Sequence, residues 1–85
     1  MGKLQIESLV LSVCATNCYL AKNKETGALL IIDPADAPSR IISRIEQMGA
    51  KPEGILLTHG HFDHIGAAMK LHAHYNIPIY AHAAE

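Results

Sequence analysis

Apolar and polar residues alternate along this chain in short runs, most of which have the length of a β-strand. The segment 4–13 alternates loosely and is rich in Leu, Val and Ile, which is typical of a strand. A second apolar run covers 17–22 and a continuous one covers 28–33, joined by a turn-like segment that contains glycine. We expect these two runs to form an antiparallel hairpin, which Pro34 ends because proline cannot donate to a strand ladder.

The middle of the chain has helical periodicity instead. Residues 38–48 predict a helix, with Pro38 suited to its first turn and Asp36 a nearby candidate cap. Gly49 is suited to the C-terminal end of this helix. The residues expected on its buried face are Ile41, Ile42, Ile45 and Met48.

Two strands and a second helix complete the pattern. Residues 54–58 predict a short buried strand, 63–75 predict a helix that ends at Asn76, and 77–81 predict a last strand. Strands that alternate with helices in this way indicate an α/β, layered fold, in which helices pack on one face of the sheet. No predicted segment is left to cover the other face.

Composition and charge narrow the classes of function. Eighty-five residues make one small domain at most. Seven basic and eight acidic residues leave a net charge of -1, which gives no electrostatic reason to expect nucleic acid or an anionic membrane as a partner. No apolar stretch approaches the roughly 20 residues of a membrane helix, and the N-terminus lacks a signal-peptide pattern. We therefore expect a soluble, cytoplasmic protein.

Several residues that could carry chemistry are interpreted as structural. Cys14 and Cys18 have no second cysteine pair to complete a metal site, and in a reducing compartment both are expected to be small, partly buried apolar residues. Tyr19, Tyr75 and Tyr80 are interpreted as core or half-buried aromatic residues.

The segment 58–66, with the sequence THGHFDHIG, occupies the expected turn from strand to helix. In extended backbone, residues two positions apart point the same way, so His59 and His61 can reach one metal ion together. Asp63 and His64 come at the start of the following helix and are well placed for a second ion. We predict these four residues as metal ligands, and Asp63 also as a catalytic residue.

This ligand set indicates hydrolytic chemistry. Imidazole nitrogen and carboxylate oxygen suit zinc, iron or manganese, and we predict two zinc ions, with iron or manganese as alternatives. Two ions about 3.5–4 Å apart can share a hydroxide and polarise a carbonyl or phosphoryl oxygen. Asp33, at a strand end, is a candidate to orient one of the imidazoles. An aspartate before a proline is also a common turn residue, which is the alternative interpretation.

A single histidine is usually a structural or surface residue, but four potential ligands within six residues are hard to explain as packing. The remaining histidines do not share this pattern. We expect His72 and His74, on the second helix, to face solvent or to be partly buried rather than to bind metal. His82 is left unassigned.

The motif resembles the His-x-His-x-Asp-His signature of the metallo-β-lactamase superfamily. Its surroundings in the segment 55–67 match too, as do the Asn-Cys-Tyr sequence at 17–19 and the Ile-Ile-Asp-Pro-Ala sequence at 31–35. Within the superfamily the chain is most similar to the glyoxalase II-like branch, the hydroxyacylglutathione hydrolases, whose helix-to-strand passage the segment 73–81 also fits.

By this resemblance, His59 and His61 hold the first metal, Asp63 and His64 hold the second, and Asp33 is the supporting carboxylate. The implied reaction is hydrolysis of a thioester, such as S-lactoylglutathione, by metal-activated hydroxide. The flavodiiron branch usually has Glu at the position of His61 and is disfavoured. Nucleases, lactonases and persulfide dioxygenases of the superfamily stay as alternatives.

The resemblance also implies an incomplete site. Family members need a further His for each metal and a bridging Asp from later in the chain, whereas no Asp follows His64 here. We expect residues 1–85 to be a fragment, the N-terminal half of an αββα sandwich with a mixed sheet. Its exposed apolar sheet face favours a homodimer or a domain swap. The competing hypothesis is a catalytically silent metal-binding or self-associating module.

Overall fold

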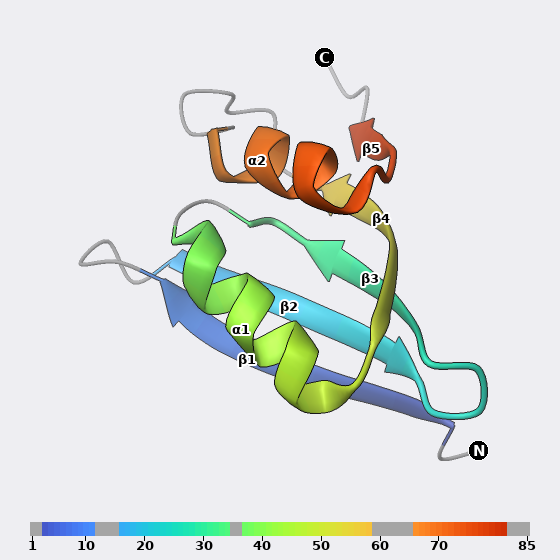
Figure 1. The fold of residues 1–85 in the computed structure, drawn as a ribbon. Helices are drawn as coiled ribbons and strands as arrows, with labels where there is room; N and C mark the ends of the chain where they lie inside the picture. The colour runs from blue at the N-terminus through green and yellow to red at the C-terminus, as the bar shows by residue number, and fades with distance from the viewer. Residues whose placement is uncertain (1–2, 12–15, 35–36, 59–65, 82–85) are drawn as a thin grey trace.

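The computed structural model describes residues 3–11, 16–34, 37–58 and 66–81, and within these ranges the chain forms a five-stranded sheet and two helices (Figure 1). The strands are β1 (Leu4–Leu11), β2 (Thr16–Asn23), β3 (Ala28–Ile32), β4 (Lys51–Leu57) and β5 (Ile79–Ala81). The helices are α1 (Pro38–Met48) and α2 (Gly66–Tyr75). The strands lie side by side in chain order. This arrangement confirms the predicted α/β layering.

The first three strands are antiparallel, and β2 and β3 form the predicted hairpin. The residues of its turn explain the conformation of that turn. The Asn23 side-chain oxygen accepts bonds from the backbone N–H groups of Glu25, at 2.8 Å, and Thr26, at 3.2 Å. Gly27 then takes a φ of 83°, which only glycine adopts readily.

The last three strands are parallel, which makes the sheet mixed, and each parallel connection passes through a helix. Strand–helix–strand connections of this kind are almost always right-handed. Because the strand order runs in one direction from β3 to β5, two right-handed connections place both helices on the same face. Figure 1 shows α1 and α2 on that one side of the sheet.

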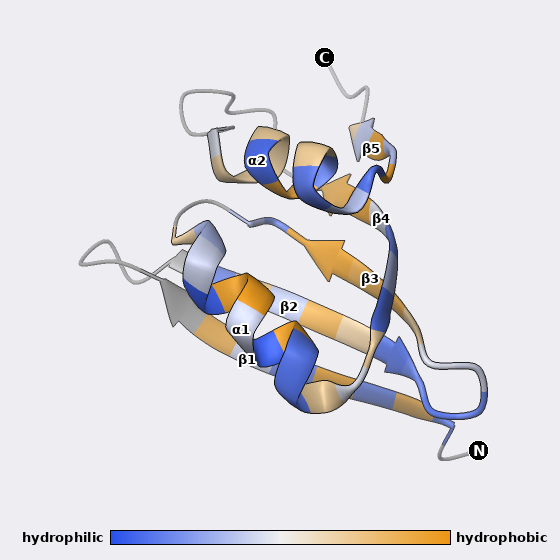
Figure 2. Cartoon of the chain, viewed as in Figure 1, coloured by the Kyte–Doolittle hydropathy of each residue, from blue (hydrophilic) through white to orange (hydrophobic). Residues whose placement is uncertain are grey.

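The helix α1 has the predicted bounds. Its apolar residues Ile41 and Ile45 are buried, and it ends at Gly49, whose φ of 64° is left-handed. Figure 2 shows apolar and polar residues alternating along α1, while β3 is apolar throughout. Among the described residues, no helix is long and apolar enough to cross a membrane.

The strand β4 is longer than predicted, because it begins at Lys51 rather than at Gly54. Pro52 interrupts a strand ladder, and the predicted strand therefore began after it. In the structure, Leu29 of β3 pairs with Pro52 and Leu30 pairs with Gly54, so the register shifts by one residue. This bulge absorbs the proline within the strand.

Other element ends also differ from prediction. Ala37, with a φ of 52° and no side-chain cap bond, holds the N-cap position of α1, whereas Asp36 lies outside the described residues. The helix α2 is described from Gly66, so its predicted start at Asp63 lies outside them as well. The last strand begins at Ile79 rather than at 77.

The hydrophobic core lies between the helices and one face of the sheet, which we call the covered face. The core side chains from the strands and helices are Cys18, Leu20, Leu29, Ile31, Ile41, Ile45, Ile55, Ala68 and Leu71, with Ile77 beside them. Cys18 is fully buried, which confirms its structural interpretation; Cys14 lies outside the described residues.

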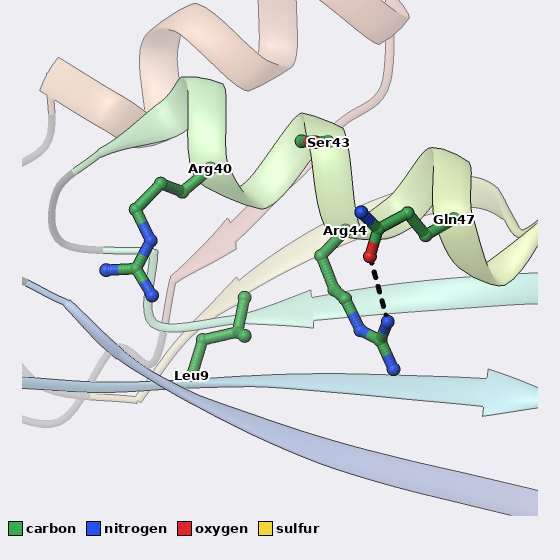
Figure 3. A pocket seen from close by; sticks show the side chains of 5 residues that line it. All are labelled: Leu9, Arg40, Ser43, Arg44 and Gln47. Atoms are coloured by element: carbon green, nitrogen blue, oxygen red, sulfur yellow. Dashed lines mark hydrogen bonds between the residues drawn. The ribbon is translucent and has the colours of Figure 1, made fainter.

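Polar bonds hold α1 on this face. The Arg44 guanidinium donates to Glu7 of β1 through Nε and Nη2, each at 2.7 Å, and the Lys22 amine of β2 donates to the Met48 carbonyl at 2.6 Å. Beside these bonds lies a groove of about 240 Å³, lined by Leu9, Arg40, Ser43, Arg44 and Gln47 (Figure 3). None of these five residues is a predicted site residue.

The opposite face, which we call the open face, is apolar and has no described segment over it. Leu4 and Ile6 are each 60% exposed, and Tyr80 is 55% exposed. A Cβ added to Gly54 would lie 3.1 Å from the Tyr80 ring, so Gly54 and Tyr80 share this face, and the strand registers place Leu4 and Ile6 on it too. Of the three tyrosines predicted to be core or half-buried, Tyr75 is half-buried, whereas Tyr19 is 37% exposed and Tyr80 is 55% exposed because no described segment covers the open face.

Candidate metal centre

The predicted metal ligands fall in the segment 59–65, outside the described residues: His59, His61, Asp63 and His64. The structure describes the residue before this segment, Thr58, and the residue after it, Gly66. Within the described ranges, no group of three or more His, Cys, Asp or Glu residues could hold a metal ion. The strand β4 leads into the segment 59–65 from its N-terminal side.

Two parallel strands end side by side at this point. Ile32 of β3 pairs with Leu56 of β4, and Asp33 and Thr58 follow the two strands directly. The ladder extends one step beyond the last pair, because the Asp33 N–H donates to the Leu56 carbonyl at 2.9 Å. Because the carboxyl ends of parallel strands share an edge of the sheet, Asp33 meets Thr58 although 25 positions separate them.

Two hydrogen bonds join these residues in what we call the Asp33–Thr58 clamp. The Thr58 backbone N–H donates to Asp33 Oδ1 at 2.8 Å, and the Thr58 hydroxyl donates to Oδ2 at 2.5 Å. Asp33 has a φ of 56°, a left-handed conformation that aspartate tolerates better than most residues. Each carboxylate oxygen thus accepts a bond from the residue that directly precedes His59.

The sequence predicted that Asp33 orients an imidazole. The structure places its carboxylate on Thr58, one residue before the first predicted ligand. Any contact with the imidazoles lies outside the described residues and stays a prediction. Thr58 itself was missed, because only the pairing of β3 with β4 shows that the two strand ends are neighbours.

Cys18 lies next to this strand end on β2. Burial, with a smaller contribution from the negative charge of Asp33, raises the pKa of the Cys18 thiol to about 12. The thiol is therefore protonated and neutral at physiological pH, and a protonated thiol is a poor metal ligand. Its place in the core agrees with this structural role.

The histidines of α2, His72 and His74, make contacts at and just beyond the C-terminal end of that helix. His72 is half-buried, and its Nδ1 lies 2.5 Å from the Ile77 carbonyl oxygen. His74 is exposed, and its ring packs edge-on against Tyr75 with a centroid distance of 4.7 Å. These positions confirm that both are surface or partly buried side chains; His82 lies outside the described residues.

Comparison with known proteins places the chain in a family. The family model described as the metallo-beta-lactamase superfamily matches residues 11–85. A hydroxyacylglutathione hydrolase, GloC of Haemophilus influenzae, is 40% identical over 77 residues, which are 91% of this chain and 36% of that protein. A probable metallo-hydrolase of Bacillus subtilis, YqgX, is 45% identical over 56 residues, 66% of this chain and 26% of its own length.

Solved structures agree with the sequence matches. The B3 metallo-beta-lactamase BLEG-1 superposes with a TM-score of 0.83 at 33% identity, over 93% of this chain and 37% of its own. The di-iron-bound form of TTHA1623 superposes with a TM-score of 0.77 at 35% identity, over 91% of this chain and 38% of its own. The chain spans between 26% and 38% of the length of these relatives. The family model and these matches together show that the chain belongs to the metallo-beta-lactamase superfamily.

Proposed function

We propose that this chain supplies the first half of the active site of a metal-dependent thioester hydrolase, acting on hydroxyacyl thioesters such as S-lactoylglutathione. The observation that carries the proposal is the Asp33–Thr58 clamp, which fixes the point where the histidine-rich segment begins. The similarity to a hydroxyacylglutathione hydrolase favours the thioester over the substrates of lactonases, nucleases or persulfide dioxygenases.

The donor set fits the proposed metals. Three imidazoles and one carboxylate within six residues suit zinc, and iron and manganese accept the same donors. We propose zinc as the metal, with iron as the alternative that the di-iron form of TTHA1623 supports. Bound ions would lower the pKa of water and polarise the thioester carbonyl. Within the chain, His59 and His61 would bind one ion and Asp63 and His64 the other.

Metal content is the direct test of this proposal. Protein purified without chelators should contain one or more equivalents of zinc, iron or manganese per chain by elemental analysis. The variant His59→Ala should lose metal, whereas His74→Ala, which removes an exposed histidine of α2, should retain it. Equal metal content in both variants would contradict the ligand assignment.

The competing proposal is a silent module, and activity separates the two. The superfamily resemblance implies ligands that are absent after His64, so the chain alone should turn over a lactoyl thioester slowly even with added zinc. Fast turnover that His59→Ala abolishes would overturn the silent-module proposal. Metal uptake without turnover would agree with the silent module for this chain alone and equally with a half-site that needs further residues.

We also propose that a second copy of the chain packs on the open face. The five strands together hold 31 residues, and at about 3.3 Å per residue and about 4.8 Å between strands they span about 500 Å². Stable interfaces bury roughly 600–1,000 Å² on each partner, so the face is slightly below the standard size and suits a weak dimer.

The chemistry of the open face also suits a second copy. The strand registers place on it the side chains of Leu4, Ile6, Tyr19, Leu30, Ile32, Leu56 and Tyr80, none of which is charged. Two copies would therefore meet without repulsion between like charges at the centre, as self-complementary interfaces require. The proposed substrate is still a small-molecule thioester, and we propose neither nucleic acid nor a membrane as a partner.

A further inference from the structure

The clamp lies at the end of β4, directly before the histidine-rich segment. Its two bonds continue the junction of β3 and β4 beyond the last ladder bond, from the Asp33 N–H to the Leu56 carbonyl. Both bonds have a carboxylate as acceptor, which makes them charge-assisted and stronger than bonds between neutral groups. The direction in which the chain leaves β4 is thus set by a contact with the neighbouring strand.

We infer that Thr58 is a positioning residue, which acts through Asp33 to set the direction in which the chain enters the metal-binding segment. The inference rests on the proposed metal-dependent function and adds to it a residue outside the ligand set. The hydroxyl of Thr58 is the group that matters, because any residue other than proline would supply the backbone N–H.

Geometry shows why this control has a large effect. In any extended chain residues are about 3.3 Å apart, so a deflection at one residue acts on an atom two residues further along through a lever of roughly 6.6 Å. A change of about 10° in the exit direction would move that atom by about 1 Å. Binding sites require their groups within about 0.5 Å of the productive position, so loss of one clamp bond is enough to weaken metal binding.

The test is the affinity of the 85-residue chain for Zn²⁺, measured by competition with a chromophoric chelator. Thr58→Val keeps the size and the backbone N–H but removes the hydroxyl, and it should weaken Zn²⁺ binding about tenfold or more. Thr58→Ser restores the hydroxyl and should return the affinity to within about threefold of wild type. A structural role alone would lower the urea midpoint without changing the affinity of the folded protein.

A matched control is available at the other end of the sheet. Thr26 also uses its hydroxyl, which accepts a bond from the Ala28 N–H at 3.2 Å in the turn between β2 and β3. Thr26→Val should therefore leave Zn²⁺ affinity unchanged. Equal affinity of wild type and Thr58→Val, or failure of Thr58→Ser to restore binding, overturns the positioning role while the proposed function stands.

A different result would bear on the proposed function itself. If the wild-type chain binds no Zn²⁺, the proposed half-site fails, and NMR of the metal-free chain then decides on Thr58. Changed amide shifts of His59 and His61 in Thr58→Val, with Thr58→Ser like wild type, would sustain the positioning role. Unchanged shifts would overturn it.

Discussion

The two faces of the sheet are made of the same strands and are both apolar, yet they have opposite surroundings. On β2, Leu20 points to the covered face and is 0% exposed, whereas its neighbour Tyr19 points to the open face and is 37% exposed. On β1, Glu7 of the covered face pairs with Arg44 of α1, and Ile6 of the open face is 60% exposed. Adjacent residues thus differ in burial because successive side chains of a strand point to opposite faces.

Among the described residues, the helices cover one face of the sheet and nothing covers the other. Sheets whose strands are apolar on both faces are normally covered on both. Here both crossover helices pack on one face, because the strand order runs one way from β3 to β5. The open face therefore exposes apolar side chains to solvent, and the contrast between the faces can be tested by matched substitutions.

The largest effect is expected from one leucine on each face. Leu20→Ala should lower the free energy of unfolding by about 2–5 kcal/mol, because it leaves a cavity beneath α1. Leu4→Ala, the same substitution at a 60% exposed position of the open face, should lower it by less than about 1 kcal/mol. Urea unfolding of dilute protein measures both. Equal losses would mean that the faces do not differ in packing.

The next effect concerns self-association through the open face. Ile6→Lys should raise the dissociation constant of the proposed dimer about 10- to 100-fold, because it places a charge where about 1.5–3 kcal/mol of apolar burial is expected. Met69→Lys is the matched control, since Met69 is 49% exposed but lies on α2. Sedimentation equilibrium measures both variants. A monomeric wild type, or dissociation by Met69→Lys alone, would contradict the proposed dimer.

The smallest effect is a pH dependence of stability that arises from Cys18 on the covered face. Because the pKa of Cys18 rises from 9.0 to about 12 on folding, its contribution to stability is complete below pH 9 and is lost as the pH rises toward 12. The free energy of unfolding should therefore fall by about 1 kcal/mol between pH 9 and pH 10 through this group, because half of the unfolded-state thiol is already ionised at pH 9. The urea midpoint of Cys18→Ala should fall less than that of wild type over this range. Parallel pH curves would show that the thiol does not contribute.

Much of the fold was predictable because it follows from local patterns. The α1 helix has the predicted bounds, since its apolar spacing, Pro38 and Gly49 all mark the same segment. The predicted start of β4 was wrong because Pro52 usually breaks a strand, whereas the bulge against Leu29 accommodates it. Such an accommodation depends on the neighbouring strand and is invisible in the local sequence.

The candidate site was likewise predictable only where local sequence patterns decide it. The motif ligands were predicted from spacing alone, and they stay predictions because they lie outside the described residues. Asp33 was predicted as a supporting carboxylate, but its described partner, Thr58, was not. A contact across 25 positions requires the parallel pairing of two strands, which the spacing of residues does not reveal.

The sequence by itself determined the type and order of the elements and the apolar character of both sheet faces, and it carries the residue types from which the chemistry of the motif is predicted. These properties depend on residue type and on short-range periodicity, which are present in the chain before it folds. The tertiary structure decided which face the helices cover and which side chain meets Asp33. Both depend on the handedness of the crossovers and the register of β3 with β4, which exist only once distant segments have packed together.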